Sequence, residues 1–338
     1  MDYLVSVIIP VFNVESYLAD CLDSVLMQDY AIFEVLAVND GSTDSSLEIL
    51  EKYAIKDPRV KILTQENKGL SAARNTGILH AIGDYVLFID SDDIVDKELI
   101  KTCLDTFLTH KTDMIIFNHA EFNDGNIDFI SKIKDLPSGK FEAINFIKEV
   151  KKISTTSWCP VCFYAYKKSF IEDHNLNFFE GILHEDVLFT PIALVSADTI
   201  AVCPAVLYYY RKRQGSITAD PKNARQSLMS YLFVAEQLYQ FSLSIGNKQK
   251  QEIFKHIVAQ RFRFILEYSK LQNSAIGDLV YKMAVYSLRK NKEVNSYFSS
   301  EFFHDHLETK IQYFCRLFVE MLVKWPRLIY KYKIKSCF

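Results

Sequence analysis

Short, nearly continuous apolar runs alternate with segments of helical periodicity along the first ninety residues of the chain. The runs are rich in β-branched residues, as buried strands are, and they span 5–10, 33–40, 60–65 and 85–90. Helical periods fill the intervals at 15–28, 45–56 and 70–82. This alternation predicts βαβ crossovers and a mostly parallel sheet with helices on both faces, an α/β fold of the nucleotide-binding type.

The pattern changes further along the chain. A fifth strand is predicted at 113–122 and a turn at 123–126, and the stretch 123–183 has little periodicity. A helix at 185–197 and a Val- and Tyr-rich strand at 199–212 follow. Helical periods at 228–243, 251–270, 279–290 and 302–323, with almost no Gly or Pro, predict a helical C-terminal region.

The composition of the chain excludes several classes of protein. The chain has 338 residues, 49% of them hydrophobic, and a net charge of −3, so it can bury a large core and has no overall field that recruits nucleic acid. No apolar run reaches the roughly 20 residues that cross a bilayer, and no signal segment opens the chain, so a cytoplasmic location is expected. Seven cysteines are an odd number for a disulfide framework, and most are expected to be reduced core thiols. Cys159 and Cys162 have the spacing of a zinc or redox pair, but no second pair and no suitably spaced histidines follow, which favours a structural role.

Carboxylates follow two of the predicted strands at the point where each strand ends. Asp40 comes after the second strand, and Asp90, Asp92 and Asp93 come after the fourth. Ligands of parallel sheets bind at these carboxyl ends. Asp90 and Asp92 point to the same side of an extended segment, and such hard oxygen ligands suit Mg²⁺ or Mn²⁺, which complete their shells with water and phosphate. The predicted ligand is a metal-bound diphosphate.

Local structure offers an alternative for each of these carboxylates. Asp92 or Asp93 could cap a helix that begins near Val95, and Asp40 could belong to an ordinary turn in which Asp44 caps the next helix. Turn chemistry does not explain a carboxylate at the end of the second strand itself. There Asp40 could accept the imide N–H of uracil or a ribose hydroxyl.

Four segments in register carry a resemblance to a known family. Residues 7–13, 38–44, 66–75 and 88–93 resemble, in that order, the motifs of the family 2 glycosyltransferases with the GT-A fold. The resemblance is close over 4–122, looser to about 219, and absent from the helical tail. It implies a GT-A catalytic domain over 1–219, with a nucleotide-binding half (1–93) and an acceptor-binding half (94–219), followed by a helical extension over 220–338.

The resemblance also implies roles for individual residues. The donor nucleotide sugar is expected to contact Pro10, Val11, Phe12, Asn13, Glu15, Asp40, Lys68, Gly69, Arg74, Asp90, Ser91, Asp92 and Arg213. Within this set Asp40 would hold the uracil, Asp90 would lie nearer the ribose, and Asp92 would bind the Mn²⁺ or Mg²⁺ that bridges the diphosphate. Arg74 has the alternative of a surface helix charge, and Arg213 that of a solvated charge beside a strand end.

The expected general base is Asp186, in the pair Glu185-Asp186 at the start of the helix predicted at 185–197. It would take the proton of the acceptor hydroxyl during one in-line displacement, which inverts the anomeric carbon. The alternative is that both acids are favoured simply by the helix dipole. Trp158 could stack on a sugar or belong to the core.

The implied activity is metal-dependent transfer of one sugar from a UDP-sugar to a hydroxyl of a lipid-linked cell-surface glycan. A Gln-x-x-Arg-Trp motif, found in the processive synthases, is absent. The alternatives are a nucleotidyltransferase and a non-catalytic nucleotide-sugar-binding protein. Five basic residues and no acid occur in 323–338, a pattern that suggests peripheral contact with the inner face of the plasma membrane. A solvated helix end or a homodimer contact would explain it equally.

Overall fold

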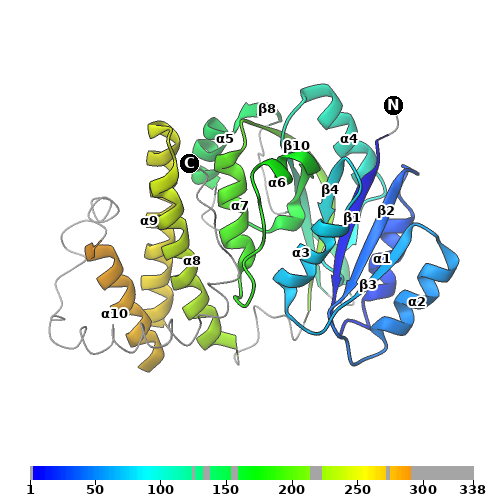
Figure 1. The fold of residues 1–338 in the computed structure, drawn as a ribbon, viewed down its shortest axis with the longest axis horizontal. Coiled ribbons are helices and arrows are strands. Elements are labelled where there is room, and N and C mark those ends of the chain that lie inside the picture. The colour runs from blue at the N-terminus through cyan, green and yellow to red at the C-terminus, as the bar shows by residue number, and fades with distance from the viewer. Residues whose placement is uncertain are drawn as a thin grey trace. The chain divides into compact units, whose positions relative to one another are not determined.

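Four parallel strands form the first half of a central sheet. The structure, a computed structural model, describes residues 3–123, 126–131, 138–153, 159–213, 223–271 and 275–290. In it, β1 (Val5–Val11), β2 (Phe33–Asn39), β3 (Val60–Thr64) and β4 (Tyr85–Phe88) lie in the order β3-β2-β1-β4, all parallel (Figure 1). Every residue of β1, β2 and β4 is buried, which explains their continuous apolar runs.

Three helices connect these strands as the periodicity predicts. They are α1 (Leu18–Leu26), α2 (Ser46–Lys56) and α3 (Leu70–His80), and α3 packs on β1 and β2. The helix expected from residue 15 begins only at Leu18. The preceding residues form a loop in which Asn13 adopts a positive φ of 51° and Glu15 bonds to the loop after β2.

The second half of the sheet is of mixed direction. The antiparallel strand β9 (Tyr164–Lys167) lies between β4 and β6 (Met114–Asn123), and β10 (Thr199–Lys212) runs parallel to β6. The short strand β5 (Ile94–Val95) pairs antiparallel with the end of β10. At the sheet's periphery β7 (Asn126–Ser131) pairs with β6, and β8 (Gly139–Glu142) pairs with β10.

Helices cover this half as well. They are α4 (Leu99–His110), α5 (Ala143–Ile153), the 3₁₀ turn η1 (Val161–Phe163), α6 (Lys168–Asp173) and α7 (Glu185–Ser196). The helix considered near Val95 is wrong, because that position belongs to β5 and α4 begins at Leu99. Asp92 and Asp93 therefore cap no helix.

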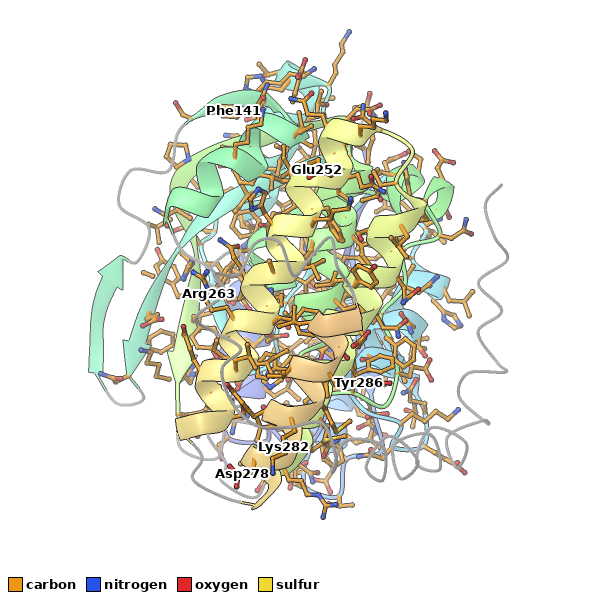
Figure 2. All side chains as sticks on the ribbon, turned by 90° about the vertical axis from the view of Figure 1, so that its left-hand side faces the viewer. Phe141, Glu252, Arg263, Asp278, Lys282 and Tyr286 are labelled. Carbon is orange, nitrogen blue, oxygen red and sulfur yellow. The ribbon has the colours of Figure 1, made fainter. Side chains whose placement is uncertain are left out.

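The contacts divide the chain into two compact units, with the boundary between Asn223 and Ala224. The second unit contains α8 (Ala224–Ser244), α9 (Lys248–Leu271) and α10 (Ala275–Lys290), which pack on one another. Polar and aromatic side chains of α9 and α10 that stay exposed or half-buried are labelled in Figure 2: Glu252, Arg263, Asp278, Lys282 and Tyr286. The helix predicted at 302–323 and the basic segment 323–338 lie outside the described residues. Within the described ranges, no helix combines the length and apolarity that a membrane span requires.

Candidate active site

The acidic turn after β4 presents two of its three aspartates to solvent. The side chains of Asp90 and Asp92 are 27% and 21% exposed, and Ser91 between them is buried. A hydrogen bond from the Asp93 N–H to the Asp90 carbonyl, 3.0 Å, closes the turn. Burial, and then the charge of Asp90, raise the pKa of Asp92 above its usual value. The neighbouring Asp90 raises the pKa because a like charge disfavours the ionised form, and the paired Arg213 opposes this effect.

Asp93 anchors this turn to β10. The Tyr208 hydroxyl donates to Asp93 Oδ2 at 2.6 Å, and the backbone N–H of Arg211 donates to Oδ1 at 2.7 Å. The same hydroxyl accepts the N–H of Asp90 at 3.1 Å. Sequence reasoning missed the parts played by Tyr208 and Arg211, although the run of tyrosines and basic residues at 208–213 was visible.

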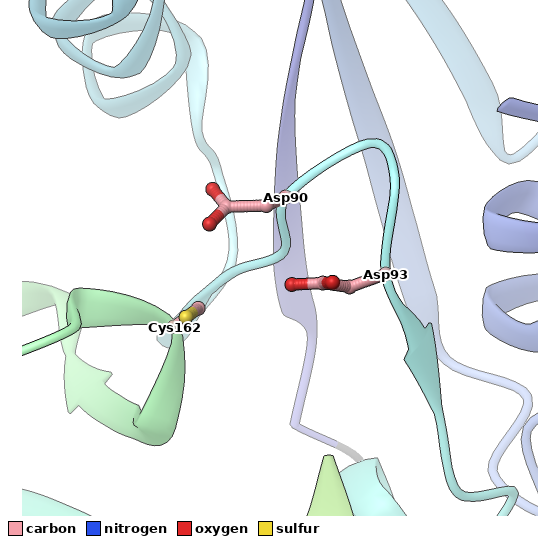
Figure 3. A group of neighbouring side chains, drawn as sticks. All are labelled: Asp90, Asp93 and Cys162. Carbon is pink, nitrogen blue, oxygen red and sulfur yellow. The ribbon is translucent and has the colours of Figure 1, made fainter. Parts of the chain in front are cut away.

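A hard divalent cation does not fit the most compact group of ligand atoms near this turn. Oxygens of Asp90 and Asp93 and the sulfur of Cys162 lie within 4.8 Å of one another (Figure 3). The two Asp93 oxygens already accept hydrogen bonds, and burial raises the pKa of the Cys162 thiol well above its usual value. A protonated, soft sulfur is a poor ligand for Mg²⁺ or Mn²⁺.

Asp90 and Asp92 do fit such a cation. Asp90 Oδ1 pairs with Arg74 at 2.7 Å and Asp92 Oδ2 pairs with Arg213 at 2.6 Å. Each pair engages one oxygen, so the second oxygen of each carboxylate can serve a metal whose remaining positions go to water and phosphate. Two carboxylates with an oxygen left for a cation are the ligand chemistry that Mg²⁺ or Mn²⁺ requires, and the role of Asp90 and Asp92 as metal ligands stays a prediction.

Arg74 joins the acidic turn to the start of α7. Its side chain is 3% exposed; Nη2 lies 2.7 Å from Asp90 Oδ1 and Nη1 lies 2.5 Å from Glu185 Oε1. Burial alone would lower the pKa of Arg74, but the charges of Asp90 and Glu185 raise it above its usual value. The predicted surface helix charge is thus wrong as an alternative, because the guanidinium is interior and doubly paired.

Asp186 follows Glu185 in the first turn of α7 and is half-buried. The N–H of Val187 donates to its Oδ1 at 2.8 Å. Burial, and then the charge of Glu185, raise the pKa of Asp186 to about 7. The preceding residue, His184, adopts a positive φ of 61°, and burial lowers its pKa to about 4, so its imidazole is neutral at pH 7.

The loops after β1 and β2 hold each other. The residues predicted there as nucleoside contacts are Pro10, Val11, Phe12, Asn13 and Glu15. Pro10 and Val11 belong to β1 and are buried, whereas the Phe12 side chain is 45% exposed. Asn13 Oδ1 accepts the N–H of Thr43 at 2.8 Å, and Glu15 Oε2 accepts that of Ser45 at 2.8 Å. Asn13 and Glu15 therefore fix the loop after β1, in which the Phe12 side chain is exposed, to the loop after β2.

Asp40 is 3% exposed and organises the loop that leads into α3. It accepts hydrogen bonds from Gln65 Nε2 (2.7 Å), the Lys68 N–H (2.9 Å) and the Gly69 N–H (2.8 Å). Gly41 has a φ of +71°, and a Cβ there would lie 2.9 Å from the Asn67 nitrogen, so only glycine fits. The structure gives Asp40 this anchoring role, and its contact with uracil stays a prediction.

Arg213 and its neighbour Arg211 flank Tyr17 of the loop before α1. Their guanidinium carbons lie 5.0 and 5.2 Å from the ring centroid. Arg211 also donates to the Asp92 carbonyl at 2.8 Å and pairs with Asp20 at 2.9 Å. Arg213 is therefore paired with the acidic turn, not a solvated charge. Residues 214–218, which follow Arg213, and Trp158 lie outside the described residues.

The structure thus brings together Asp90, Asp92, Arg74, Arg213 and Asp186 with its neighbour Glu185. The second group, around Asp40, shares the same edge of the sheet, because the Asp40 N–H donates to the carbonyl of Val11 at the end of β1. One polar region therefore lies at the strand ends. It contains Asp90 and Asp92, which suit a cation, Asp186, which suits a general base, and the loops after β1 and β2. Such a region suits transfer chemistry on a phosphorylated donor.

Comparison with known proteins identifies the family. Residues 6–174 match the glycosyl transferase family 2 domain. The glycosyltransferase GlyG of Streptococcus pneumoniae is 33% identical over 223 residues, 64% of this chain and 73% of GlyG. GlyA of the same organism is 35% identical over 228 residues, which are 64% of this chain but only 32% of GlyA. The crystal structure of Staphylococcus aureus TarS residues 1–349 in complex with UDP-GlcNAc superposes with a TM-score of 0.68 and 25% identity, covering 83% of this chain and 79% of that one.

The family and the fold agree with the arrangement of carboxylates at the strand ends. The chain belongs to glycosyl transferase family 2, and it is a glycosyltransferase with the GT-A fold.

Proposed function

We propose that the protein is an inverting, metal-dependent glycosyltransferase that moves one sugar from a UDP-sugar to a hydroxyl of a cell-surface glycan. The observation that carries this proposal is the double ion pair of Arg74 with Asp90 and Glu185. It sets carboxylates suited to the donor's cation beside the helix turn that bears a candidate base. The TarS crystal with UDP-GlcNAc supports a uridine diphosphate donor.

On the donor side, Asp90 and Asp92 would hold Mn²⁺ or Mg²⁺. When bound, the ion neutralises the diphosphate and stabilises the departing UDP. Arg213, which pairs with Asp92, would add a second positive charge near the leaving group. The nucleoside would lie along the loops after β1 and β2, with Phe12 exposed to it and with Lys68 at the loop that Asp40 holds.

On the acceptor side, Asp186 would accept the proton of the attacking hydroxyl. A pKa of about 7 suits this role, because a general base works best when its pKa lies near the operating pH. Attack from the face opposite the leaving UDP is a single displacement and inverts the anomeric carbon. A lipid-linked acceptor and membrane contact through 323–338 remain predictions, since that segment lies outside the described residues.

The experiment is UDP release from a panel of nucleotide sugars, beginning with UDP-GlcNAc, with Mn²⁺ and with a chelator. We expect one UDP-sugar to respond, only with the ion, and the anomeric configuration of the product to be opposite to that of the donor. Asp92→Asn should lose most of the metal-dependent UDP binding measured by calorimetry. Asp186→Asn should bind UDP normally and lose about 10²–10⁴-fold in turnover. Asp105→Asn, at an exposed position on α4, is the matched control.

Two results would contradict the proposal. The first is a wild-type protein that releases UDP from no nucleotide sugar. The second is release that a chelator leaves unchanged, which would remove the metal from the mechanism while leaving the family assignment intact.

A further inference from the structure

Arg74 is the link between two parts of the chain that lie far apart in sequence. It stands on α3, pairs with Asp90 after β4, and pairs with Glu185 at the start of α7. Its guanidinium carbon also lies 5.3 Å from the centre of the Phe178 ring. A guanidinium this deeply buried is stable only when its charge is matched, and two carboxylates match it here.

A second tie from α3 reaches the same region. Asn75, the next residue, mimics a backbone pair with Phe178: its Nδ2 donates to the Phe178 carbonyl and its Oδ1 accepts the Phe178 N–H, each at 2.9 Å. The Phe178 ring stacks on Phe189 of α7, with centroids 4.2 Å apart and planes inclined by 8°. Two successive residues of α3 therefore hold α7, one by charge and one through a stacked aromatic.

We propose that Arg74 and Glu185 are positioning residues, which hold Asp186 at a fixed place relative to the donor-side carboxylate Asp90. The inference rests on the proposed function, in which Asp186 is the base. Glu185 is one residue from Asp186 and its carboxylate is directed to Arg74. A shift of the first turn of α7 would move the base away from the acceptor hydroxyl.

Direct contact of Arg74 with the nucleotide is the competing possibility, and the geometry disfavours it. Both terminal nitrogens of the guanidinium are in ion pairs and the side chain is 3% exposed. Its Nε has no hydrogen-bond partner in the described part of the chain, and that atom is buried too. To reach a donor, Arg74 would have to break a buried pair and leave a carboxylate without its partner, which is strongly unfavourable.

Removal of Arg74 would also take away the guanidinium charge that lies near the three carboxylates Asp90, Glu185 and Asp186. Their repulsion would act on the first turn of α7, so loss of either partner should disturb the same geometry. The effects of Arg74→Gln and Glu185→Gln should for that reason not be additive.

The test compares Arg74→Gln, Glu185→Gln and the double variant in kcat, donor KM and calorimetric affinity for UDP with Mn²⁺. Each single variant should lose about 100-fold in kcat, the cost of a misplacement near 1 Å, with UDP affinity within about threefold of wild type. The double variant should be no slower than the slower single variant. Arg59→Gln is the control, because Arg59 pairs with Asp57 away from the site.

Conservative variants keep the test decisive if a glutamine variant fails to fold. Arg74→Lys and Glu185→Asp retain the charges, and each should have a kcat between those of the wild type and the glutamine variants, with thermal unfolding close to wild type. A tenfold or greater loss of UDP affinity in Arg74→Gln together with normal kcat in Glu185→Gln would overturn the positioning role. Additive losses in an active protein would overturn it as well, whereas a wild type without turnover on any nucleotide sugar would overturn the proposed function and this role with it.

Discussion

Lowering the pH below 7 should lower kcat, because it protonates Asp186. This carboxyl ordinarily has a pKa of 3.8, and in the folded protein burial, followed by the charge of Glu185, raises the pKa to about 7. A general base acts only when deprotonated, so kcat should be constant above about pH 8 and fall as the pH drops through 7. At pH 5 about 1% of the plateau rate should remain, since the deprotonated fraction falls tenfold with each pH unit.

The assay is UDP release between pH 5 and pH 9, at saturating donor and Mn²⁺. Saturation is needed because burial raises the pKa of Asp92 as well, and its protonation would weaken the hold on the cation. Calorimetric binding of UDP with Mn²⁺ at each pH separates the two effects. Turnover at pH 5 equal to that at pH 8, with UDP still bound, would refute the assignment of Asp186 as the base.

The same pKa makes a prediction about stability. A carboxyl whose folded-state pKa is raised destabilises the fold progressively as the pH rises from about 4 to about 7, and the full cost is present above pH 7. Three pKa units correspond to about 4 kcal/mol, an upper limit because solvent screens the half-buried group. Asp186→Asn should therefore unfold at a higher temperature than the wild type at pH 8, and the difference should shrink towards pH 4.

Two further predictions concern the scaffold. Gly77→Ala should lower the free energy of unfolding by about 1–3 kcal/mol in urea titrations, because the new Cβ would lie 2.3 Å from Cγ2 of the fully buried Ile8; Gly246→Ala, where nothing lies within 4 Å, is the control and should change stability little. Tyr208→Phe should cost about 1–3 kcal/mol in thermal unfolding, because it removes a donor from the buried Asp93 carboxylate. Unchanged unfolding in either variant would contradict the contact on which its prediction depends.

The parallel half of the fold was predictable because its signals are local. Strands buried on both faces give continuous apolar runs, and the helices between them bury one face, so the element types from 5 to 88 follow from periodicity. The second half depends on long-range pairing. No local sequence pattern marks β9 as a strand, because its four residues are held by pairing with β4 and β6. The residues of β5 were predicted to begin a helix, because the strand that pairs with them, β10, lies more than one hundred residues later in the sequence.

The candidate site shows the same division. Asp90, Asp92 and Asp186 stand out in the sequence because each is a carboxylate at a strand end or a helix start, where a ligand of the sheet would meet it. The residues that pair with these carboxylates do not stand out in the sequence. Tyr208 resembles any other residue of an apolar strand, and Arg74 and Glu185 are 111 positions apart. Asp40 was expected to face a ligand, whereas its oxygens turn inward to backbone N–H groups of a loop that sequence alone does not place beside it.

The strand β9 has a consequence for how this protein is made. It supplies hydrogen-bond partners to β4, whose residues are all buried in the finished sheet, yet it is translated long after Phe88. A ribosome adds about 5–20 residues per second, so this edge of β4 would have no strand partner on the nascent chain for several seconds. An unpaired border of this kind invites other strands to join it, so the emerging polypeptide should need a chaperone at this stage, and truncated products that stop before Tyr164 should aggregate.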